Sequence, residues 1–542
     1  MHTSLFIRSQ YSPIRRTVRL LAVWLAGIAA VVLSGCATPL PAIDRQAIVS
    51  EAIPLSPQTT LGRIALKSTP SKEQSGFRLM PLGTFSYDTR IDLAHRAEVS
   101  LDVQYYHFEN DASGRYLLRA LRDAALRGVR VRLLIDDLYT GGNDPLFLAF
   151  AAHPNVEVRL FNPFCCARDQ GQTGRFVASI GDWSRVNHRM HNKMFIADGA
   201  MVVFGGRNVA NEYFLRNDKA ENFIDVDAFT IGFIVPPLQA LFDRYWNSDP
   251  VYPFTAVAKT SMTKQELLER FEEWTGPANT PPPDPIPPND ILGYGPIADD
   301  LEGGRLGLIW GNAYVFADYP DKPFEVGGDA ELLETSATYN AYEAIRKARS
   351  EVVATSPYLV PGERGMALLR ELRGRGVKLT LMTNSLGSTD EPVVHLGYSH
   401  YREEMLRIGV DLYELSAQRV KKNKRNYLFG ASLGRLHAKL VVIDRKTVFV
   451  GSMNLDPRSA TINTELGAVI ESPELARELV RVIDIDRLQS AYRVRLASNG
   501  RGLEWLSIEG EEEKVQTTEP ESSPWLRLKL WLLTHLVPES LL

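Results

Sequence analysis

The chain has 542 residues, of which 44% are hydrophobic and 23% are charged, and its formal net charge is −4. This length accommodates two domains or one double-lobed unit, and the composition is that of a globular protein. Residues 1–35 carry four Arg and no Asp or Glu, so the chain that follows them has a net charge of −8. An acidic chain argues against non-specific binding of nucleic acid, which depends on neutralising phosphates. The three cysteines lack the spacing of a metal site, so we expect no metal and no cofactor.

Residues 1–35 have the pattern of a secretion signal. Basic residues precede an apolar run from Leu20 to Leu33, which is short for a membrane-spanning helix. The run ends in Leu-Ser-Gly-Cys36, which resembles the cleavage box of bacterial lipoproteins, in which the Cys becomes the acylated first residue. We therefore expect Cys36 to be lipidated and the chain to be a lipoprotein of a bacterial cell envelope that faces the periplasm. Inner and outer membrane both remain open, and an uncleaved signal anchor is the alternative.

A unit of strand, helix and strand occurs twice in the chain. The first copy predicts a strand at Val99–Tyr106, a helix from Leu117 and a second strand that ends at Ile135. The second copy predicts the same order from Glu351 to Met382. Such units indicate an α/β fold with two pseudo-symmetric lobes, each a mixed β-sheet flanked by helices.

The predicted boundaries follow from composition. We assign a signal (1–35), a polar tether (36–75), an N-terminal lobe (76–275), a Pro-rich linker (276–300), a C-terminal lobe (301–500) that starts with a strand at Leu306–Trp310, and a tail (501–542) with the apolar segment Trp525–Leu536.

The strongest repeat is a His-x-Lys-x4-Asp motif. Its two copies are His191, Lys193 and Asp198, and then His437, Lys439 and Asp444. Each copy is followed at the same offset by Gly-[Gly/Ser]-x-Asn, which ends at Asn208 and Asn454. One copy of the motif alone would be a weak signal, but two copies with the same tail are specific.

The motif suits phosphate chemistry. Residues i and i+2 of a strand share a face, so the His and the Lys of each copy point the same way. A Lys ammonium holds a phosphoryl oxygen, and an imidazole attacks phosphorus or carries a proton near neutral pH. Two facing half-sites allow one His to attack while the other protonates the leaving oxygen. We expect one shared active site between the lobes, with Asn208 and Asn454 as donors to the phosphate and a structural role for Asp198 and Asp444.

A nucleophilic His works better when a carboxylate holds its other nitrogen. Asp225 and Glu465 lie just past the two motifs and align with each other in the two halves. Asp227 and Glu221 are alternatives to Asp225.

These motifs resemble those of the phospholipase D superfamily, over roughly residues 80–500. Arg189–Lys193, Gly205–Phe214 and Asn454–Ser459 are similar to the corresponding stretches of bacterial cardiolipin synthases, particularly the C-type branch, which can use phosphatidylethanolamine as donor. The resemblance implies a phosphohistidine intermediate on His191, with His437 as general acid. It also implies transfer of a phosphatidyl group from phosphatidylethanolamine or phosphatidylglycerol to phosphatidylglycerol, forming cardiolipin. Gly206 departs from the Ser that is commoner at its position.

Two other functions remain open. A phospholipase D that releases phosphatidic acid would use every one of these residues, and a nuclease-type phosphodiesterase is a further alternative. We expect a phospholipid membrane and anionic headgroups as partners, and no nucleic acid. A basic cluster is a candidate for binding the headgroups, and the apolar tail segment is a candidate for lying in the membrane interface. The cluster comprises Arg419, Lys421, Lys422, Lys424 and Arg425.

Overall fold

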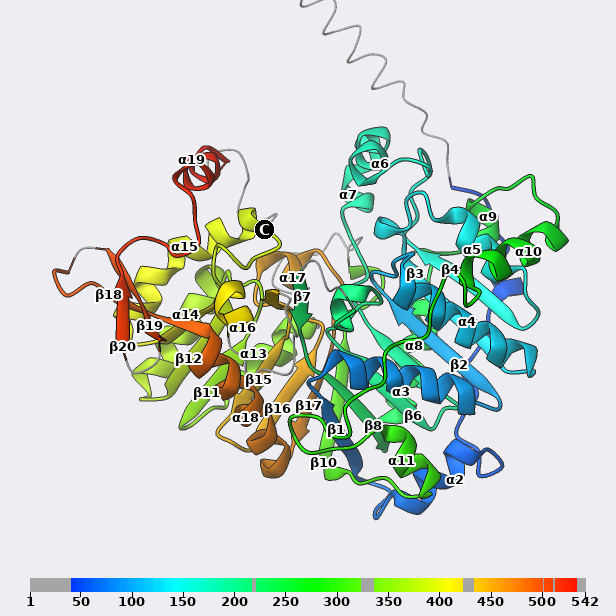
Figure 1. Cartoon of the computed structure of the whole chain (residues 1–542), viewed down its shortest axis with the longest axis horizontal. Coiled ribbons are helices and arrows are strands. Elements are labelled where there is room, and N and C mark those ends of the chain that lie inside the picture. Colours follow the sequence, from blue (N-terminus) through cyan, green and yellow to red (C-terminus); the bar gives the residue numbers. More distant parts are fainter. Residues whose placement is uncertain are drawn as a thin grey trace, which may run out of the picture.

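The computed structural model describes residues 40–216, 221–322, 336–422, 433–500, 502–509 and 512–533. The predicted signal, Cys36, Lys424 and Arg425 lie outside the described residues. Two lobes stand side by side, with the N-terminal lobe in blue to green and most of the C-terminal lobe in yellow to red (Figure 1). This arrangement confirms the predicted α/β fold with two lobes.

The sheet of the N-terminal lobe has a parallel centre and an antiparallel flank. Its strands are, in spatial order, β9 (Val251–Pro253), β4 (Val156–Phe161), β3 (Arg130–Asp136), β2 (Ser100–Tyr105), β5 (Met194–Ala197), β6 (Met201–Gly205), β8 (Asp227–Gly232) and β1 (Ser75–Met80). Strands β2, β3 and β4 run parallel, and β5 joins β2 antiparallel. Their side chains are almost all buried, as expected for strands covered on both faces.

The C-terminal lobe repeats this topology. Its strands are β13 (Asp411–Leu415), β12 (Lys378–Asn384), β11 (Glu351–Thr355), β15 (Leu440–Ile443), β16 (Thr447–Gly451), β17 (Leu466–Glu471) and β10 (Ile309–Ala317). Strand β13 is extended by the tail strands β18 (Ala491–Leu496), β19 (Leu503–Glu509) and β20 (Glu512–Gln516). In each lobe, the motif strand (β5 or β15) therefore lies beside the first strand of the repeat unit.

Strand β10 joins the two sheets. It pairs antiparallel with β1 of the first lobe and with β17 of the second, so the lobes share one continuous 18-stranded sheet. We expected a strand at Leu306–Trp310 to start the second lobe. The strand begins three residues later, at Ile309, and it belongs to both lobes because it is long enough to pair with two partners.

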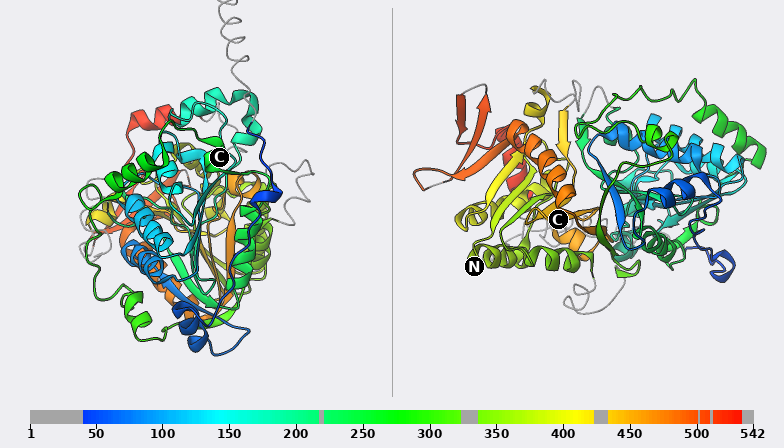
Figure 2. Two further views of the ribbon diagram at one scale, coloured as in Figure 1. Left: turned by 90° about the vertical axis from the view of Figure 1, so that its right-hand side faces the viewer. Right: turned by 90° about the horizontal axis from the view of Figure 1, so that it is seen from below.

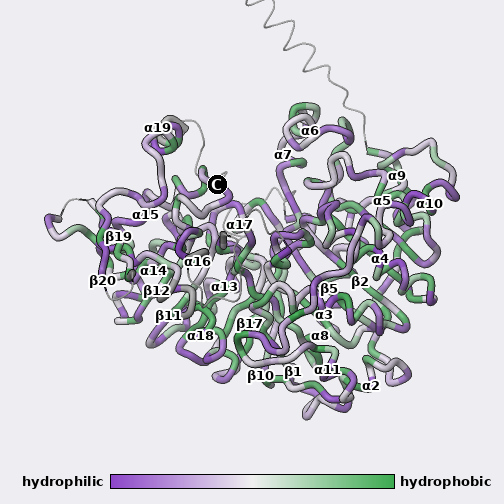
Figure 3. Tube along the Cα trace, in the orientation of Figure 1, coloured by the Kyte–Doolittle hydropathy of each residue, from purple (hydrophilic) through white to green (hydrophobic). Residues whose placement is uncertain are grey.

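Helices cover the outer faces and fill the space between the lobes. The outer face of the first sheet carries α3 (Gly83–Arg96), α4 (Ala112–Leu126), α5 (Asp144–Ala151), α9 (Phe254–Val257) and α10 (Lys264–Thr275), and that of the second carries α13 (Ala337–Arg346), α14 (Gly362–Gly374) and α15 (Pro392–Arg407). Between the lobes, α8 (Val235–Trp246) and α18 (Pro473–Ser490) contribute to one core with strands of both sheets. In Figure 3, hydrophobic segments of the chain gather in the interior of the molecule, where the strands lie.

The predicted tether and linker both contain ordered segments. Helix α2 (Thr60–Ser68) buries Leu61 against the first lobe, and Arg45 donates to the carbonyl oxygen of Ser248. In the Pro-rich segment, the Tyr294 hydroxyl donates to Glu478 of α18 at 2.8 Å before α11 (Ile297–Glu302) begins. These contacts attach both segments to the body of the protein.

Three short helices project from one side of the molecule. They are α6 (Gln172–Ala178) and α7 (Trp183–Val186) on the first lobe and α19 (Pro524–Leu533) on the second (Figures 1 and 2). Among the residues that the structure describes, no helix is both long and apolar enough to cross a bilayer.

Candidate active site

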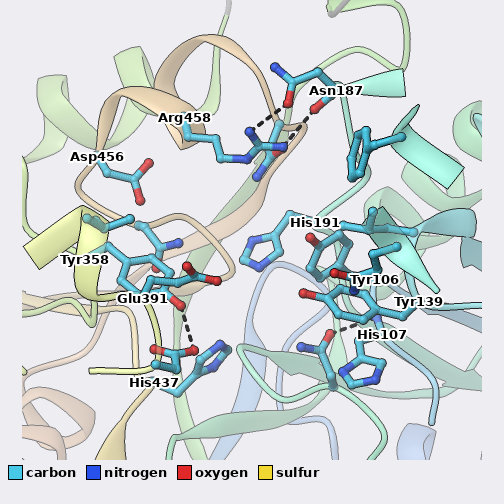
Figure 4. A pocket seen from close by; sticks show the side chains of 18 of the residues that line it. Tyr106, His107, Tyr139, Asn187, His191, Tyr358, Glu391, His437, Asp456 and Arg458 are labelled. Carbon is cyan, nitrogen blue, oxygen red and sulfur yellow. Dashed lines mark hydrogen bonds between the residues drawn. The ribbon is translucent and has the colours of Figure 1, made fainter. Parts of the chain in front are cut away.

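A cavity of about 430 Å³ lies between the lobes and receives side chains from both motifs (Figure 4). His191 and Asn208 reach it from the first lobe, and His437 and Asn454 reach it from the second. The structure thus brings the two motifs, which are far apart in sequence, to one site.

Backbone pairing across the lobes positions the two imidazoles. Strand β14 (Leu433–Leu436), just before His437, runs parallel to β7 (Glu221–Ile224) of the other lobe. The amide of His437 then donates to the carbonyl oxygen of Ile224 at 2.7 Å. In the equivalent contact of the other motif, the amide of His191 donates to the carbonyl oxygen of Thr464 at 2.9 Å. Each motif therefore lies beside the residue that precedes the carboxylate of the other lobe.

The carboxylates are exchanged between the lobes. His191 Nδ1 lies 2.9 Å from Oε2 of Glu465, and His437 Nδ1 lies 2.7 Å from Oδ2 of Asp225. We had identified this pair of carboxylates as candidates just past each motif, without foreseeing that each would serve the His of the opposite lobe. The alternative Asp227 instead accepts from Arg90 at 2.9 Å, and Glu221 lies at the start of β7.

Burial keeps both imidazoles neutral near pH 7. It lowers the pKa of His191 to about 4, even though Glu465 opposes the shift, and it lowers the pKa of His437 well below its ordinary value, with the nearby Lys439 adding to the effect. A neutral imidazole whose Nδ1–H donates to a carboxylate presents a free lone pair on Nε2. Both histidines are therefore prepared to attack an electrophile or to accept a proton.

The two lysines are buried beside the histidines. Each Nζ donates to the carbonyl oxygen of its own motif His, and neither lysine is among the residues that line the cavity. Burial lowers the pKa of Lys439 to about 8 and the pKa of Lys193 well below its ordinary value. An anion in the cavity would favour the charged form of both lysines.

The two carboxylates are supported differently. Glu465 accepts hydrogen bonds from the hydroxyls of Ser452 and Ser459, the latter at 2.8 Å. Asp225 receives the amide of Val226 at 2.8 Å, but Gly206 stands where the other half has Ser452. A Cβ at Gly206 would lie 2.5 Å from Oδ2 of Asp225, so any larger residue here would have to displace this carboxylate.

The pKa values of the two carboxylates shift in opposite directions. Burial raises the pKa of Asp225. Burial also disfavours the charge of Glu465, but His191, Lys193 and the Ser452 hydroxyl outweigh it and lower the pKa of that carboxyl. The more firmly ionised carboxylate therefore lies behind His191.

The two asparagines differ in their freedom. Asn208 donates from Nδ2 to the Tyr213 hydroxyl at 2.9 Å, and its Oδ1 accepts from the amide of His107 at 3.2 Å. Asn454 also lines the cavity, but its buried Oδ1 has no hydrogen-bond partner among the described residues. Of the two asparagines, Asn454 is thus the one whose side chain is open to a ligand.

Asp198 and Asp444, which we counted with the motifs, lie outside the cavity lining. Asp198 accepts from the amides of Val99 at 2.8 Å and Ser100 at 3.1 Å, where β2 begins. Asp444 accepts from the amide of Ser350 at 2.7 Å, just before β11. Each carboxylate ties the end of its motif strand to the start of the neighbouring strand, which is the geometry of a structural role.

The cavity has an aromatic side and an acidic side, neither of which we predicted. In Figure 4, Tyr106 and Tyr139 lie on one side, and Tyr358, Glu391 and Asp456 lie on the other. No motif signal marked these positions, except that Asp456 belongs to the stretch after Asn454 that carried the family resemblance.

The acidic wall consists of Asp390, Glu391 and Asp456. Asp390 Oδ2 accepts from the Tyr358 hydroxyl at 2.8 Å, and its buried Oδ1 has no partner among the described residues. Burial raises the pKa of all three carboxyls, that of Asp456 to about 7. A cation in the cavity would lie beside these three carboxyls and would favour their ionised forms.

Two further histidines, His107 and His395, have partners of their own. His107 lines the cavity, but its Nε2 lies 2.8 Å from Glu109 and its ring stacks on Tyr139. His395 pairs with Glu519 at 2.8 Å. The described residues hold no group of three or more His, Cys, Asp or Glu side chains that could bind a metal ion.

Two repeated lobes, each contributing the His of its His-x-Lys-x4-Asp motif to one cavity, define an enzyme of the phospholipase D superfamily. A family model described as "Cardiolipin synthase, PLD-like domain" matches residues 91–246 and 342–486. The chain belongs to this family of cardiolipin synthase-like proteins.

Curated relatives cover most of the chain. It is 37% identical to cardiolipin synthase C of Escherichia coli (strain K12) over 465 residues, which cover 84% of this chain and 94% of the relative. It is 26% identical to cardiolipin synthase A of Pseudomonas aeruginosa (strain LESB58), over 79% of this chain and 70% of the relative.

A solved structure shares the fold. The crystal structure of phosphatidylserine synthase from Haemophilus influenzae Rd KW20 aligns with a TM-score of 0.54 and 12% sequence identity, covering 89% of this chain and all of that one. At this identity the similarity establishes the fold alone.

Proposed function

We propose that the protein forms cardiolipin by transferring a phosphatidyl group from one phospholipid to phosphatidylglycerol through a phosphohistidine. The observation that carries the proposal is the exchanged pairing, in which each cavity histidine is held by a carboxylate of the other lobe. The 37% identity to cardiolipin synthase C supports the choice of reaction.

In the first half of the reaction, Nε2 of His191 attacks the phosphorus of the donor. The P–N bond forms and the bond from phosphorus to the headgroup oxygen breaks, while His437 gives that oxygen a proton. Burial favours the neutral form of His437, and the negative charge of the incoming phosphodiester favours its protonation. Lys193 and Lys439 stabilise the charge that develops on the phosphoryl oxygens.

In the second half, a hydroxyl of phosphatidylglycerol attacks the phosphorus from the side of His437. The P–N bond breaks, the new P–O bond forms, and His437 takes the proton of the hydroxyl. His191 is thereby restored.

The acidic wall supports phosphatidylethanolamine as the preferred donor. Asp390, Glu391 and Asp456 would attract the ammonium group of phosphatidylethanolamine, whereas the glycerol headgroup of phosphatidylglycerol offers them no positive charge. The same wall disfavours a nucleic acid, whose backbone carries one negative charge per nucleotide. Hydrolysis to phosphatidic acid remains the second candidate, because it uses the same catalytic residues and differs only in the acceptor.

The experiment that tests this function is lipid turnover on defined vesicles. The purified protein is incubated with vesicles of phosphatidylethanolamine and phosphatidylglycerol, and products are quantified by mass spectrometry, with His191→Ala and His437→Ala as inactive controls. We expect cardiolipin from the wild type alone. Phosphatidic acid without cardiolipin would replace the proposal with the hydrolase, and no turnover of either lipid would overturn it.

The donor preference has its own test. Glu391→Gln should lower the rate with phosphatidylethanolamine about tenfold relative to the rate with phosphatidylglycerol alone. Glu403→Gln is a matched control, because Glu403 is exposed on α15 and pairs with Arg407 away from the cavity. An equal loss with both donors would contradict the assignment of the acidic wall to the ethanolamine group.

The location is part of the proposal. A lipid on Cys36 would hold the enzyme on a membrane of the bacterial envelope, on the periplasmic side. Mass spectrometry of the mature N-terminus, with Cys36→Ser as control, tests this. A mature chain that retains residues 1–35 would contradict it.

A further inference from the structure

One rim of the cavity carries exposed apolar side chains. Helices α6 and α7 and the turn between them stand above the first lobe (Figure 1). Val177 is 56% exposed, Ile180 is 51% exposed and Trp183 is 46% exposed. Trp183 contacts the ring of Phe176, but about half of its side chain still faces solvent. Clustered exposed apolar side chains mark interaction sites.

The opposite rim carries a second such group. Trp525 at the start of α19 is 75% exposed, and Lys529, one turn later, is also exposed. The helix is fixed to the body, because Leu530 is buried and Glu519, which precedes the helix, binds His395 and Arg402 of α15. Its exposed tryptophan is therefore held in place on the surface of the second lobe.

Both rims border the mouth of the active-site cavity. Phe176 of α6 and Trp183 of α7 line the cavity on one side, and Val394 of α15, the helix that supports α19, lines it on the other. The two views in Figures 1 and 2 place α6, α7 and α19 on the same side of the molecule, and both rims show hydrophobic stretches in Figure 3. The cavity thus opens between two apolar projections.

The described chain also begins on this side. In Figures 1 and 2 its first described residues lie on the side of the molecule that carries α6 and α7. Cys36 precedes residue 40 by four positions, a length of chain that spans at most about 14 Å. A lipid on Cys36 would therefore anchor the protein on the side of the molecule that carries this rim.

We infer that α6, α7 and α19 form a docking surface that seats the mouth of the cavity on the surface of a phospholipid bilayer. Tryptophan suits the boundary between headgroups and acyl chains, and Val177 and Ile180 would insert below it. Lys529 would meet anionic headgroups. The inference deepens the proposed function and rests on it: both substrates would enter the cavity from the bilayer without crossing water.

The docking surface predicts different kinetics for lipids in vesicles and for lipids in solution. Lipids in a bilayer must be reached through the rims, whereas short-chain lipids dissolved as monomers diffuse into the cavity directly. Val177, Ile180 and Trp525 do not line the cavity. Changing them should therefore affect turnover of vesicles and spare turnover of monomers.

The test uses the mature chain with Cys36→Ser, which lacks the lipid, so that the surface alone determines binding. One variant carries Val177→Ser, Ile180→Ser and Trp525→Ala together. A matched control carries Leu126→Ser, which removes a 58% exposed leucine at the end of α4, on the flank of the first lobe (Figure 1). Three proteins are compared: the Cys36→Ser parent, the triple variant and the control. For each, vesicle binding is measured by sedimentation, and turnover is measured with vesicles and with short-chain monomers.

Compared with the Cys36→Ser parent, we expect the triple variant to bind vesicles at least tenfold more weakly and to turn them over at least tenfold more slowly, with turnover of monomers within twofold. The control should match the parent in every measurement. Vesicle binding by the triple variant equal to that of the control would overturn the inference, and so would an equal loss of both activities in a folded protein. Sedimentation does not depend on turnover, so a failure of the proposed function, seen as no transfer by wild type, stays distinguishable from a failure of docking.

Discussion

The two half-sites have the same backbone arrangement but differ in the residues that hold their histidines. In one, Glu465 is ionised firmly and receives two serine hydroxyls, whereas in the other Asp225 approaches Gly206 without a hydroxyl donor. A histidine that attacks phosphorus gains positive charge, which a firmly ionised carboxylate stabilises. A histidine that exchanges protons must instead alternate between two states at little cost. The difference supports His191, held by Glu465, as the nucleophile, independently of family resemblance.

The largest expected effect separates these two roles. His191→Ala and His437→Ala should each reduce transfer from natural lipids by more than about 10³-fold. With a donor whose leaving group needs no proton, such as a phosphatidyl-p-nitrophenol, His437→Ala should still form the covalent intermediate, whereas His191→Ala should not. Release of nitrophenol, together with mass spectrometry of the trapped protein, measures both.

The opposite outcome would reverse the comparison. A phosphorylated His437 in the His191→Ala protein would make the less supported half-site the nucleophilic one. The difference between Glu465 and Asp225 would then need another explanation.

The lysines give the next largest effect and a pH dependence. Lys439→Met should lower kcat/KM about 10²–10³-fold, because the transition state loses a buried positive charge. Since burial lowers the pKa of Lys439 to about 8, its charge is present below pH 8 and is lost as the pH rises through that value. We expect kcat/KM of wild type to fall on the alkaline side near pH 8.

Lys439→Arg supplies the control for this pH dependence. A guanidinium stays charged at these pH values, so the variant should be slower at pH 7 but should show no decline between pH 7 and pH 9. An unchanged decline in this variant would assign the alkaline titration to another group.

The supports of the two carboxylates can be compared directly. Gly206→Ala places a methyl group 2.5 Å from Asp225 and must displace that carboxylate, which should lower kcat about 100-fold. Ser452→Ala removes one hydroxyl from Glu465 but leaves Ser459 in place, so we expect a loss of about tenfold. Single-turnover rates measure both. A larger loss in Ser452→Ala would show that the hydrogen bond matters more than the close packing.

The sequence was informative where local pattern decides the structure. The four residues after each motif Lys, Met194–Ala197 and Leu440–Ile443, are continuous apolar runs and coincide with β5 and β15, because such short runs are typical of strands buried on both faces. The equal spacing in the two motif copies also predicted one site between two lobes. These features depend on residues close together in the chain.

What the sequence did not reveal depends on contacts between distant residues. The exchange of Glu465 and Asp225 arises because β7 and β14 pair across the lobes, and no local pattern encodes that pairing. Strand β10 joins the sheets for the same kind of reason. The acidic wall was missed because Asp390 and Glu391 belong to no motif and gain their meaning only from the cavity they line.

The smallest expected effect concerns the two motif aspartates, which have the same geometry but pKa values that shift in opposite directions. Both adopt a positive φ, 50° at Asp198 and 52° at Asp444, and Asn tolerates this conformation, so Asp→Asn tests the charge without adding backbone strain. Burial raises the pKa of Asp198. The pKa of Asp444 is lowered, since hydrogen bonds from Ser350 and the neighbouring amides outweigh its slight burial.

A depressed pKa stabilises the fold above the unfolded pKa, and the contribution is lost as the pH falls through the folded value. Asp444→Asn should therefore lower the Tm by about 1–3 °C at pH 7 and by less near pH 3, with salt reducing the difference because the group is partly exposed. A raised pKa has the opposite sign, so the cost of Asp198→Asn should shrink as the pH rises from 4 to 7. Thermal unfolding across this pH range measures both. Parallel pH profiles for the two variants would show that the two carboxylates, despite their different burial, contribute to folding through hydrogen bonds alone.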